Sequence, residues 1–424
     1  MQVYIKTYGC SLNHADSSII DTILKEDGIR VCNSESEADV VLVNTCVVKS
    51  SAERRIIDYI SKRASEGKRI VATGCMAGSY PERISKYAPE ASVITTPNIM
   101  RISDAVRESA SGNTIMLSEY RKIDRVSYFN KDSFGRVVEQ IPISDGCMSS
   151  CGFCATKLSR GTLNSFAESS ILNAVRFAVK RGAKEIQITS QDVGAYGLDR
   201  GTNISELMWS ISEIEGDFKV RIGMLNPEHL WRYIENFAAA LSSDRFYKFV
   251  HLPIQSGSEK VLRAMGRGYT PEQVTDHIAY LRKKATGVSF MTDLIVGYPT
   301  ETDKDFADTL DFVRATEPDT VNLSKFTARP GTRASRMTQI PDKEIKRRST
   351  IATKEVHDAQ RLVNQRHIGK RYKCLITEQN DRSSNGRTDS YKQVVLADSS
   401  IIPGERRDVE ITAVTSNVLY GKVL

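Results

Sequence analysis

Three cysteines within eight residues constrain this chain more than any other feature. Cys147, Cys151 and Cys154 follow the pattern C-x3-C-x2-C, directly after the apolar run 137–143, which predicts a strand. Thiolates spaced this closely on a loop suit an iron–sulfur cluster, where each iron takes one cysteine. A cubane cluster has four irons, so three cysteines leave one iron open for another ligand.

Two other interpretations of this loop are a zinc knuckle and three unrelated core cysteines. Structural zinc sites usually take four nitrogen or sulfur ligands, and no histidine lies near the loop. Buried structural cysteines seldom cluster so tightly. The sequence therefore favours the iron–sulfur cluster.

The composition is that of a soluble globular protein, with 40% apolar and 26% charged residues in a chain of 424, a length typical of about three domains. The apolar runs fall short of the roughly 20 residues of a membrane span. The N-terminus lacks a signal-peptide pattern. We therefore expect a cytoplasmic protein without a membrane partner, in which eight cysteines bind metal rather than form disulfides.

Residues 1–111 alternate between strand and helix patterns, which predicts an open parallel sheet with helices on its faces. The strands are expected over 3–8, 39–44, 69–73 and 92–95, and the helices over 13–26, 50–65 and 100–109.

Cys10, Cys46 and Cys75 each follow one of these strands. The carboxyl ends of parallel strands share one edge of a sheet, where ligands bind. We therefore expect the three side chains to converge and form a second three-cysteine cluster, although three buried thiols are the alternative. Cys32 and Cys374 lack this placement and are expected to be core residues.

Residues 112–135 have the composition of a linker, with a short strand at 114–117. Residues 136–340 then contain six strand–helix units, which predict a partial TIM-like (β/α)6 barrel with active residues at the carboxyl ends of its strands. The strands are expected over 137–143, 185–189, 219–225, 248–254, 288–296 and 320–326, and the helices over 168–181, 205–214, 227–241, 271–284 and 302–315.

The C-terminal part is basic, with 16 Lys and Arg against 11 Asp and Glu over 341–424. Residues 341–367 predict one long bridging helix. Residues 368–424 predict a small antiparallel β-barrel, with strands over 372–376, 393–396, 409–414 and 418–424 and turns at Asn385-Gly386 and Pro403-Gly404. A basic terminal module suggests a polyanionic partner such as nucleic acid, and a solvated charged surface is the alternative.

Six cysteines in this domain order, with Arg160-Gly161 after the central loop and 385–391 in the last module, resemble the radical S-adenosylmethionine (SAM) methylthiotransferases over essentially the whole chain. The last module resembles a TRAM domain. Segments 189–197 and 221–227, together with Thr156-Lys157, are similar to the branch that acts on N6-threonylcarbamoyladenosine in tRNA. Eukaryotic members carry a C-terminal membrane anchor, so the chain resembles the archaeal form.

The resemblance implies two [4Fe-4S] clusters and SAM. One SAM would methylate a sulfur held at the N-terminal cluster. A second, bound at the central cluster, would yield the radical that removes hydrogen from C2 of the adenine at position 37. Such a C–H bond is inert to acid–base chemistry, so a radical cofactor is needed. The alternatives are another target, either isopentenyladenosine in tRNA or a ribosomal-protein aspartate, and a non-catalytic iron–sulfur protein that binds RNA.

Candidate SAM contacts lie at the central strand ends, where polar side chains could bind the ribose, adenine and carboxylate of SAM, although each could equally cap a loop. They are Phe153, Ser190, Asp192, Gln255 and Arg267. Arg267, within the segment 265–269, could pair with a carboxylate, and a surface arginine is the alternative.

For the RNA, a single-stranded anticodon loop is the expected target. The candidate contacts are Lys157, Arg160, Arg387 and Lys392. The sulfur donor, the electron donor and the oligomeric state stay open.

Overall fold

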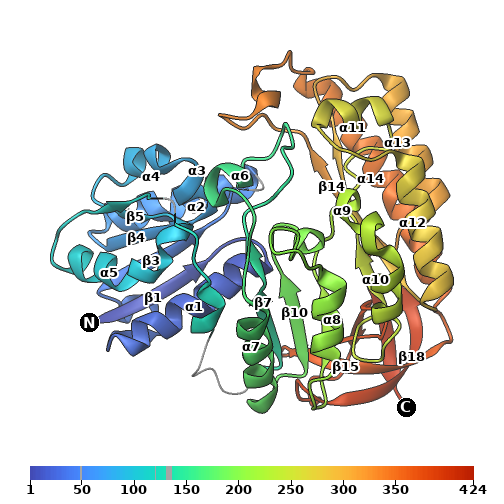
Figure 1. Cartoon of the computed structure of the whole chain (residues 1–424), viewed down its shortest axis with the longest axis horizontal. Helices are drawn as coiled ribbons and strands as arrows, with labels where there is room; N and C mark the ends of the chain where they lie inside the picture. The colour runs from blue at the N-terminus through green and yellow to red at the C-terminus, as the bar shows by residue number, and fades with distance from the viewer. Residues whose placement is uncertain (48–49, 120, 130–135) are drawn as a thin grey trace.

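The computed structural model describes residues 1–47, 50–119, 121–129 and 136–424. An N-terminal sheet domain lies beside a central arc of strands and helices, and a small C-terminal barrel lies at the base of that arc (Figure 1). Across those ranges, the structure holds no helix that is both long and apolar enough to cross a membrane.

The N-terminal domain is a six-stranded parallel sheet with the order β2-β1-β3-β4-β5-β6. Alternate side chains of its central strands pack against α1 and α5 on one face and against α2 and α4 on the other, as expected for a parallel sheet. The strands are β1 Gln2–Thr7, β2 Arg30–Cys32, β3 Val40–Thr45, β4 Arg69–Gly74, β5 Ser92–Ile94 and β6 Met116–Leu117. The helices are α1 Ser11–Glu26, α2 Ser50–Ser65, α3 Cys75–Ser79, α4 Pro81–Tyr87 and α5 Ile102–Ala110.

Strand β6 comes from the segment predicted to be a linker. It pairs with β5 through Val93 and Met116, so the N-terminal sheet continues past residue 111. Residues 120 and 130–135 of the predicted linker lie outside the described part of the chain.

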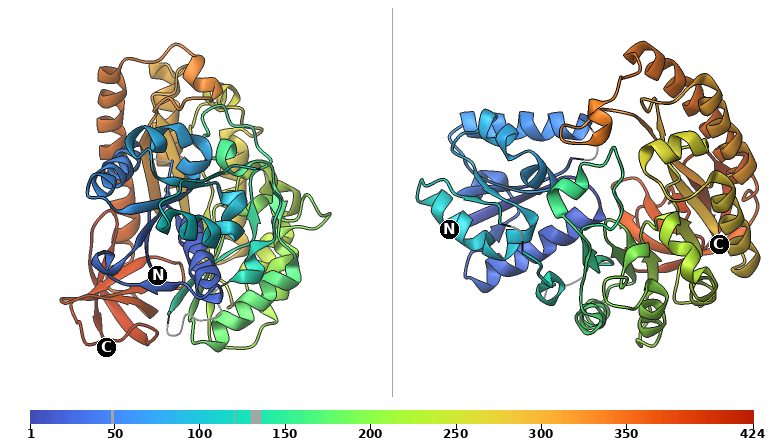
Figure 2. Two further views of the ribbon diagram at one scale, coloured as in Figure 1. Left: turned by 90° about the vertical axis from the view of Figure 1, so that its left-hand side faces the viewer. Right: turned by 45° about the horizontal axis from the view of Figure 1, so that its top comes forward.

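The central domain confirms the predicted partial barrel of six parallel strands. Two three-stranded sheets, β11-β10-β7 and β12-β13-β14, are joined by a parallel bridge between Val220 and Phe246. The helices lie on the outer side of this arc (Figure 2). The strands are β7 Val138–Pro142, β10 Glu185–Thr189, β11 Lys219–Ile222, β12 Phe249–His251, β13 Ser289–Val296 and β14 Thr320–Lys325. The outer helices are α7 Glu168–Lys180, α8 Ile204–Ser212, α10 Ile234–Leu241, α12 Pro271–Lys284 and α13 Asp303–Thr316.

Several helices of this domain differ from the prediction, among them the short α6 (Thr156–Arg160), which was not expected. The helix expected over 227–241 is broken into α9 (Pro227–Leu230), a 3-10 turn (Trp231–Tyr233) and α10. Tyr233 leaves the helical conformation there, with φ −144° and ψ 22°, and its hydroxyl donates to the carbonyl of Gly194. The short helix α11 (Glu259–Met265), which Ser258 caps, was not predicted.

The long basic helix is α14 (Asp342–Gln365), and it leads into a closed five-stranded barrel with the order β15-β16-β17-β19-β18. The barrel was expected to be antiparallel throughout, but β17 and β19 pair in parallel. Asn385 and Gly386 lie within β16 and do not form the expected turn. A Cβ at Gly386 would lie 3.1 Å from Ile376 Cδ1, so glycine lets β16 pack closely on its neighbour. The strands are β15 Arg371–Gln379, β16 Ser384–Arg387, β17 Gln393–Leu396, β18 Arg406–Val414 and β19 Leu419–Val423.

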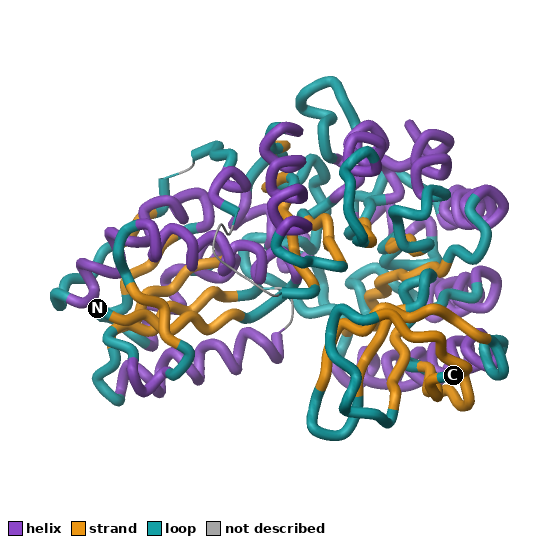
Figure 3. Tube along the Cα trace, turned by 90° about the horizontal axis from the view of Figure 1, so that it is seen from below, coloured by secondary structure: helices purple, strands orange, loops and turns teal. Residues whose placement is uncertain are grey.

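The barrel lies below the central arc (Figure 3). The loop between β16 and β17 contacts the amino ends of the central strands, where Lys248 N donates to Asp389 O at 2.8 Å. The Tyr391 hydroxyl donates to Glu185 Oε1 at 3.0 Å. Its ring lies 4.8 Å from the Tyr247 ring and 5.0 Å from the Phe249 ring, measured between centroids. Aromatic pairs of this kind contribute beyond their buried area. The barrel is therefore anchored at the end of the arc opposite to the cysteine loop.

Tyr391→Ala should lower the free energy of unfolding by about 3 kcal/mol, because it removes a packed aromatic ring and leaves the Glu185 carboxylate without this donor. Urea unfolding followed by tryptophan fluorescence measures the change. Tyr420→Ala is the matched control, because Tyr420 is 40% exposed on β19 and its loss should cost no more than about 0.5 kcal/mol. Equal effects of the two substitutions would contradict this anchoring role.

Candidate active site

The central cysteine loop is held from several sides. Cys147 N donates to Gly161 O at 3.2 Å, and Gly152 N donates to Met265 O at 2.8 Å. Lys157 Nζ donates to Ser149 O at 2.9 Å. The loop follows β7, as predicted, and all three of its cysteines are half-buried. Lys157, predicted to contact RNA, binds the cysteine loop in the free protein.

The chemistry of this donor set fits an iron–sulfur cluster. Burial, with Asp192 nearby, raises the pKa of Cys147 to about 12. Burial also raises the pKa of Cys151, which Arg267 opposes. Bound iron would stabilise the thiolate form of these buried cysteines and displace the thiol protons. No three His, Cys, Asp or Glu side chains within the described ranges converge on a single metal ion, and a cubane does not require this, because each thiolate binds a different iron.

Ser190 and Asp192 shape the loop that follows β10. Asp192 Oδ1 accepts from Gly194 N at 3.0 Å and from Asn226 N at 2.9 Å, so it joins this loop to the one after β11. Ser190 Oγ accepts from Asp192 N at 3.1 Å. Burial raises the pKa of Asp192, although His229 and Arg267 oppose this. Both predicted residues thus lie just past the carboxyl end of β10, and Asp192 is close to Cys147.

Arg267 lies close to the central cysteines. Its guanidinium carbon is 5.6 Å from the centroid of the Phe153 ring. Burial alone would lower the pKa of Arg267, but the nearby Tyr269, Cys151 and Cys154 outweigh burial and raise it. The structure therefore brings two predicted SAM contacts, Phe153 and Arg267, together beside the cysteines and supplies a positive charge there.

Gln255 lies at the carboxyl end of β12 in a left-handed conformation, with φ 77°. Its backbone N donates to Asp293 O at 2.9 Å, and its carbonyl accepts from Ile295 N at 2.9 Å. A non-glycine residue in this conformation costs about 1–3 kcal/mol, and such strain is concentrated at functional sites.

The structure adds residues that the sequence interpretation missed. Gln191 Oε1 and His229 Nδ1 are buried polar atoms without a hydrogen-bond partner among the described residues, and the same holds for Nε of Arg267, which was predicted. Such atoms cost free energy unless a ligand pairs with them, so they fit a polar molecule such as SAM. The strand-end rule would have found Asn226 and His229, because both follow β11 as Ser190 follows β10.

The N-terminal cysteines follow three neighbouring strands and lie at one edge of the sheet. Strands β1, β3 and β4 are neighbours in register, and Cys10, Cys46 and Cys75 follow them. A Cβ at Gly9 would lie 3.0 Å from Cys46 Cβ. Burial raises the pKa of Cys75, and the nearby Cys10 adds to this. Gly74, with φ 86°, makes the turn before Cys75, where a Cβ would lie 2.4 Å from Thr45 O. Cluster binding at this set stays a prediction.

The two cysteine sets border the same domain interface. Helix α3 begins at Cys75, and helix α6 (Thr156–Arg160) begins two residues after Cys154. The helices pack closely, since a Cβ at Gly78 would lie 2.8 Å from Ser159 Cβ. Ser79 Oγ also donates to Ala155 O at 3.1 Å. The two sets are thus joined by a pair of packed short helices.

The predicted RNA contacts need correction at two positions. The Arg160 side chain is 0% exposed and pairs with Asp16 and Asp145. The Lys392 side chain is 9% exposed, and its Nζ lies 2.8 Å from Asp319 Oδ1. Neither can reach a phosphate, because each neutralises buried carboxylates. Sequence alone does not distinguish such a buried cation from an exposed one.

Arg387, the remaining predicted RNA contact, is half-buried. Its guanidinium carbon lies 5.0 Å from the centroid of the Tyr391 ring, so it packs on the loop that anchors the barrel.

Comparisons with family models agree with the three domains. Residues 2–96 match the uncharacterized protein family UPF0004, residues 141–313 match the Radical SAM superfamily, and residues 365–424 match the TRAM domain.

Solved structures show the same fold at low identity. The radical SAM methyltransferase TsrM from Kitasatospora setae is 14% identical, with a TM-score of 0.60 over 78% of this chain and 76% of that chain. The cobalamin-dependent radical SAM enzyme OxsB has a TM-score of 0.51 over 84% of this chain and 55% of that chain, at 13% identity.

An open six-stranded parallel arc with three cysteines after its first strand, matched by the superfamily model, defines a radical SAM enzyme. Relatives named probable threonylcarbamoyladenosine tRNA methylthiotransferase are 35% identical in Pyrococcus abyssi, over 100% of both chains, and 37% identical in Archaeoglobus fulgidus, over 100% of this chain and 99% of that one. The human threonylcarbamoyladenosine tRNA methylthiotransferase is 32% identical over 97% of this chain and 72% of its own length. The chain belongs to this methylthiotransferase family.

Single cysteine substitutions test the ligands. Cys10→Ala, Cys75→Ala and Cys151→Ala should each remove about half of the iron from anaerobically reconstituted protein, because each would lose one of two clusters. The iron and sulfide contents measure this. Cys32→Ala and Cys374→Ala are controls, since both residues are buried core thiols, and they should keep the full content. Full iron in the Cys10→Ala and Cys75→Ala variants would exclude the N-terminal cluster.

Proposed function

We propose that this enzyme adds a methylthio group to C2 of N6-threonylcarbamoyladenosine at position 37 of tRNA, giving 2-methylthio-N6-threonylcarbamoyladenosine. The observation that carries the proposal is the pair of three-cysteine sets on either side of one packed helix pair, α3 and α6. The names of full-length relatives supply the substrate class.

In this proposal Cys147, Cys151 and Cys154 hold one [4Fe-4S] cluster beside bound SAM, and together these groups supply the radical chemistry that an unactivated aromatic C–H bond requires. Arg267, a buried cation beside Cys151 and Cys154, would pair with the SAM carboxylate. Asp192 keeps the loops after β10 and β11 in position through its bonds to Gly194 N and Asn226 N.

Cys10, Cys46 and Cys75 would hold a second [4Fe-4S] cluster, which would carry the sulfur. Packing of Gly78 against Ser159 limits the freedom of one set relative to the other. A fixed separation matters because the sulfur and the adenine C2 atom must meet in a defined geometry.

The anticodon loop is the proposed RNA target, since its bases are unpaired and accessible. The barrel is docked at the base of the arc, away from the cysteines, so it would bind tRNA by the phosphates. Lys370 and Lys373 lie at the start of the barrel and are exposed. They are candidate phosphate contacts in place of Arg160 and Lys392.

The activity is tested with reduced enzyme, SAM and tRNA that carries threonylcarbamoyladenosine. Nucleoside analysis should find the 2-methylthio product, together with 5′-deoxyadenosine. Cys151→Ala should form neither. Product on tRNA with isopentenyladenosine instead would favour the other target, and the absence of 5′-deoxyadenosine would favour a non-catalytic RNA-binding protein. Nucleosides from a strain lacking the gene should have lost the 2-methylthio modification.

Affinity for tRNA should fall with salt, because phosphate contacts release counterions. The double substitution Lys370→Glu and Lys373→Glu should weaken binding and reduce the slope of log K against log salt by about one unit per lost contact. Fluorescence anisotropy at several salt concentrations measures both. Lys304→Glu on α13, with a side chain 85% exposed, is the control for one charge reversal away from the barrel, and a loss there of half the size of the loss in the double variant would contradict the assignment to the barrel.

A further inference from the structure

Arg160 crosses the interface between the N-terminal and central domains, and its side chain is 0% exposed. Its Nε donates to Cys75 Sγ at 3.3 Å. Its Nη1 donates to Asp145 Oδ1 at 3.0 Å, and its Nη2 donates to Asp16 Oδ2 at 2.6 Å and to Asn13 Oδ1 at 3.0 Å. The Arg160 guanidinium thus contacts Cys75 of the N-terminal set. It also contacts Asp145, which lies two residues before Cys147 of the central set.

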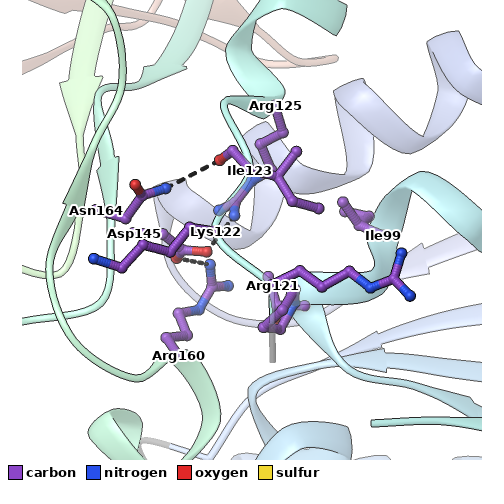
Figure 4. Close-up of a pocket in the computed structure, with 10 residues that line it drawn as sticks. Ile99, Arg121, Lys122, Ile123, Arg125, Asp145, Arg160 and Asn164 are labelled. Carbon is purple, nitrogen blue, oxygen red and sulfur yellow. Dashed lines mark hydrogen bonds and ion pairs between the residues drawn. The ribbon is translucent and has the colours of Figure 1, made fainter. Parts of the chain in front are cut away.

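A second arginine shares the carboxylates but has a different position. Arg125 pairs with Asp16 Oδ1 at 2.9 Å and also with Asp145, and Figure 4 shows Arg125 and Arg160 converging on Asp145. Two buried cations therefore face two buried carboxylates. The Cys75 sulfur is an additional acceptor for Arg160. The described ion pairs and hydrogen bonds of Arg125 are with the two carboxylates and do not include this sulfur.

The pocket beside this cluster is small. It is lined by Arg125, Asp145, Arg160 and Asn164 among others, and offers about 10 Å³ to the centre of a water molecule, room for roughly one water. The pocket cannot hold SAM or a nucleobase. The Arg160 and Asp16 side chains are 0% and 2% exposed. This burial strengthens the bond from Arg160 to the sulfur, because a low local dielectric weakens the screening of charge.

We propose that Arg160 is a positioning residue that sets the reduction potential of the N-terminal cluster through its charged hydrogen bond to Cys75 Sγ. This inference rests on the proposed function, in which Cys75 is a cluster ligand. One-electron reduction adds a negative charge to the cluster, and Arg160 stays protonated throughout. A fixed cation and N–H group stabilise that added charge, and hydrogen bonds to the sulfurs are among the features that set cluster potentials.

The contact also makes the potential depend on domain docking. Arg160 ends α6, which follows Cys154, whereas Cys75 belongs to the N-terminal domain. The bond exists only when the two domains are packed together. The N-terminal cluster would therefore have its full potential only in the docked enzyme.

The test uses the full chain with Cys147, Cys151 and Cys154 replaced by Ala, so that only the N-terminal cluster remains. In this background Arg160→Met is compared with Arg125→Met. Each removes one cation from the same pair of carboxylates, and only the first removes the bond to Cys75. The readouts are the iron content and the midpoint potential, from dithionite titration followed by electron paramagnetic resonance.

Arg160→Met should shift the midpoint to more negative values, and Arg125→Met should shift it clearly less. Equal shifts, or no shift in Arg160→Met at full iron content, would overturn the role of Arg160. If Arg160→Met loses its iron, Arg160→Lys decides, because lysine keeps the charge without the fork that reaches the sulfur and both carboxylates at once. A midpoint potential in Arg160→Lys equal to that of the parent would also overturn the role of Arg160. A folded parent without any cluster would instead refute the two-cluster function.

Discussion

The buried ion pairs between Asp16, Arg125, Asp145 and Arg160 are the interaction on which the arrangement of this molecule depends. They join α1 of the N-terminal domain to the segments on both sides of the central cysteine loop. Buried ion pairs add little net stability, because desolvation offsets their attraction, yet removing one partner costs about 3–5 kcal/mol. Their effect is therefore geometric, since few relative positions of the two domains satisfy all four charges at once.

The placement of the cysteines follows from general rules and could be predicted. Period-two and period-3.6 patterns identify the strands and helices, and parallel strands bring their carboxyl ends to one edge. The strand-end rule places Cys10, Cys46 and Cys75, which span 65 positions of the chain, at one edge of the N-terminal sheet. It places Asp192 at the same edge of the arc as the central loop. It depends only on backbone topology, which hydrophobic patterning determines.

The partners of charged side chains could not be predicted in the same way. Arg160 and Lys392 carry the same charge as an RNA contact would, and only the packed structure shows that Asp145 and Asp319 neutralise them. Elements shaped by tertiary contacts were missed for a similar reason. Gly386 resembles a turn residue locally, but the narrow barrel requires it within a strand. Tyr233 has ordinary helical neighbours, yet its bond to Gly194 O breaks the helix.

Tyr391 anchors the barrel at the end of the arc that lies away from the cysteines. Because Tyr391 binds at the amino ends of the central strands, the carboxyl edge with its cysteines is left free of the barrel. Phosphate contacts made by the barrel would therefore act at a distance from the base that reacts. In the proposed function, selection of that base would come from side chains near the cysteine loops, whereas the barrel would contribute affinity that is independent of sequence and sensitive to salt.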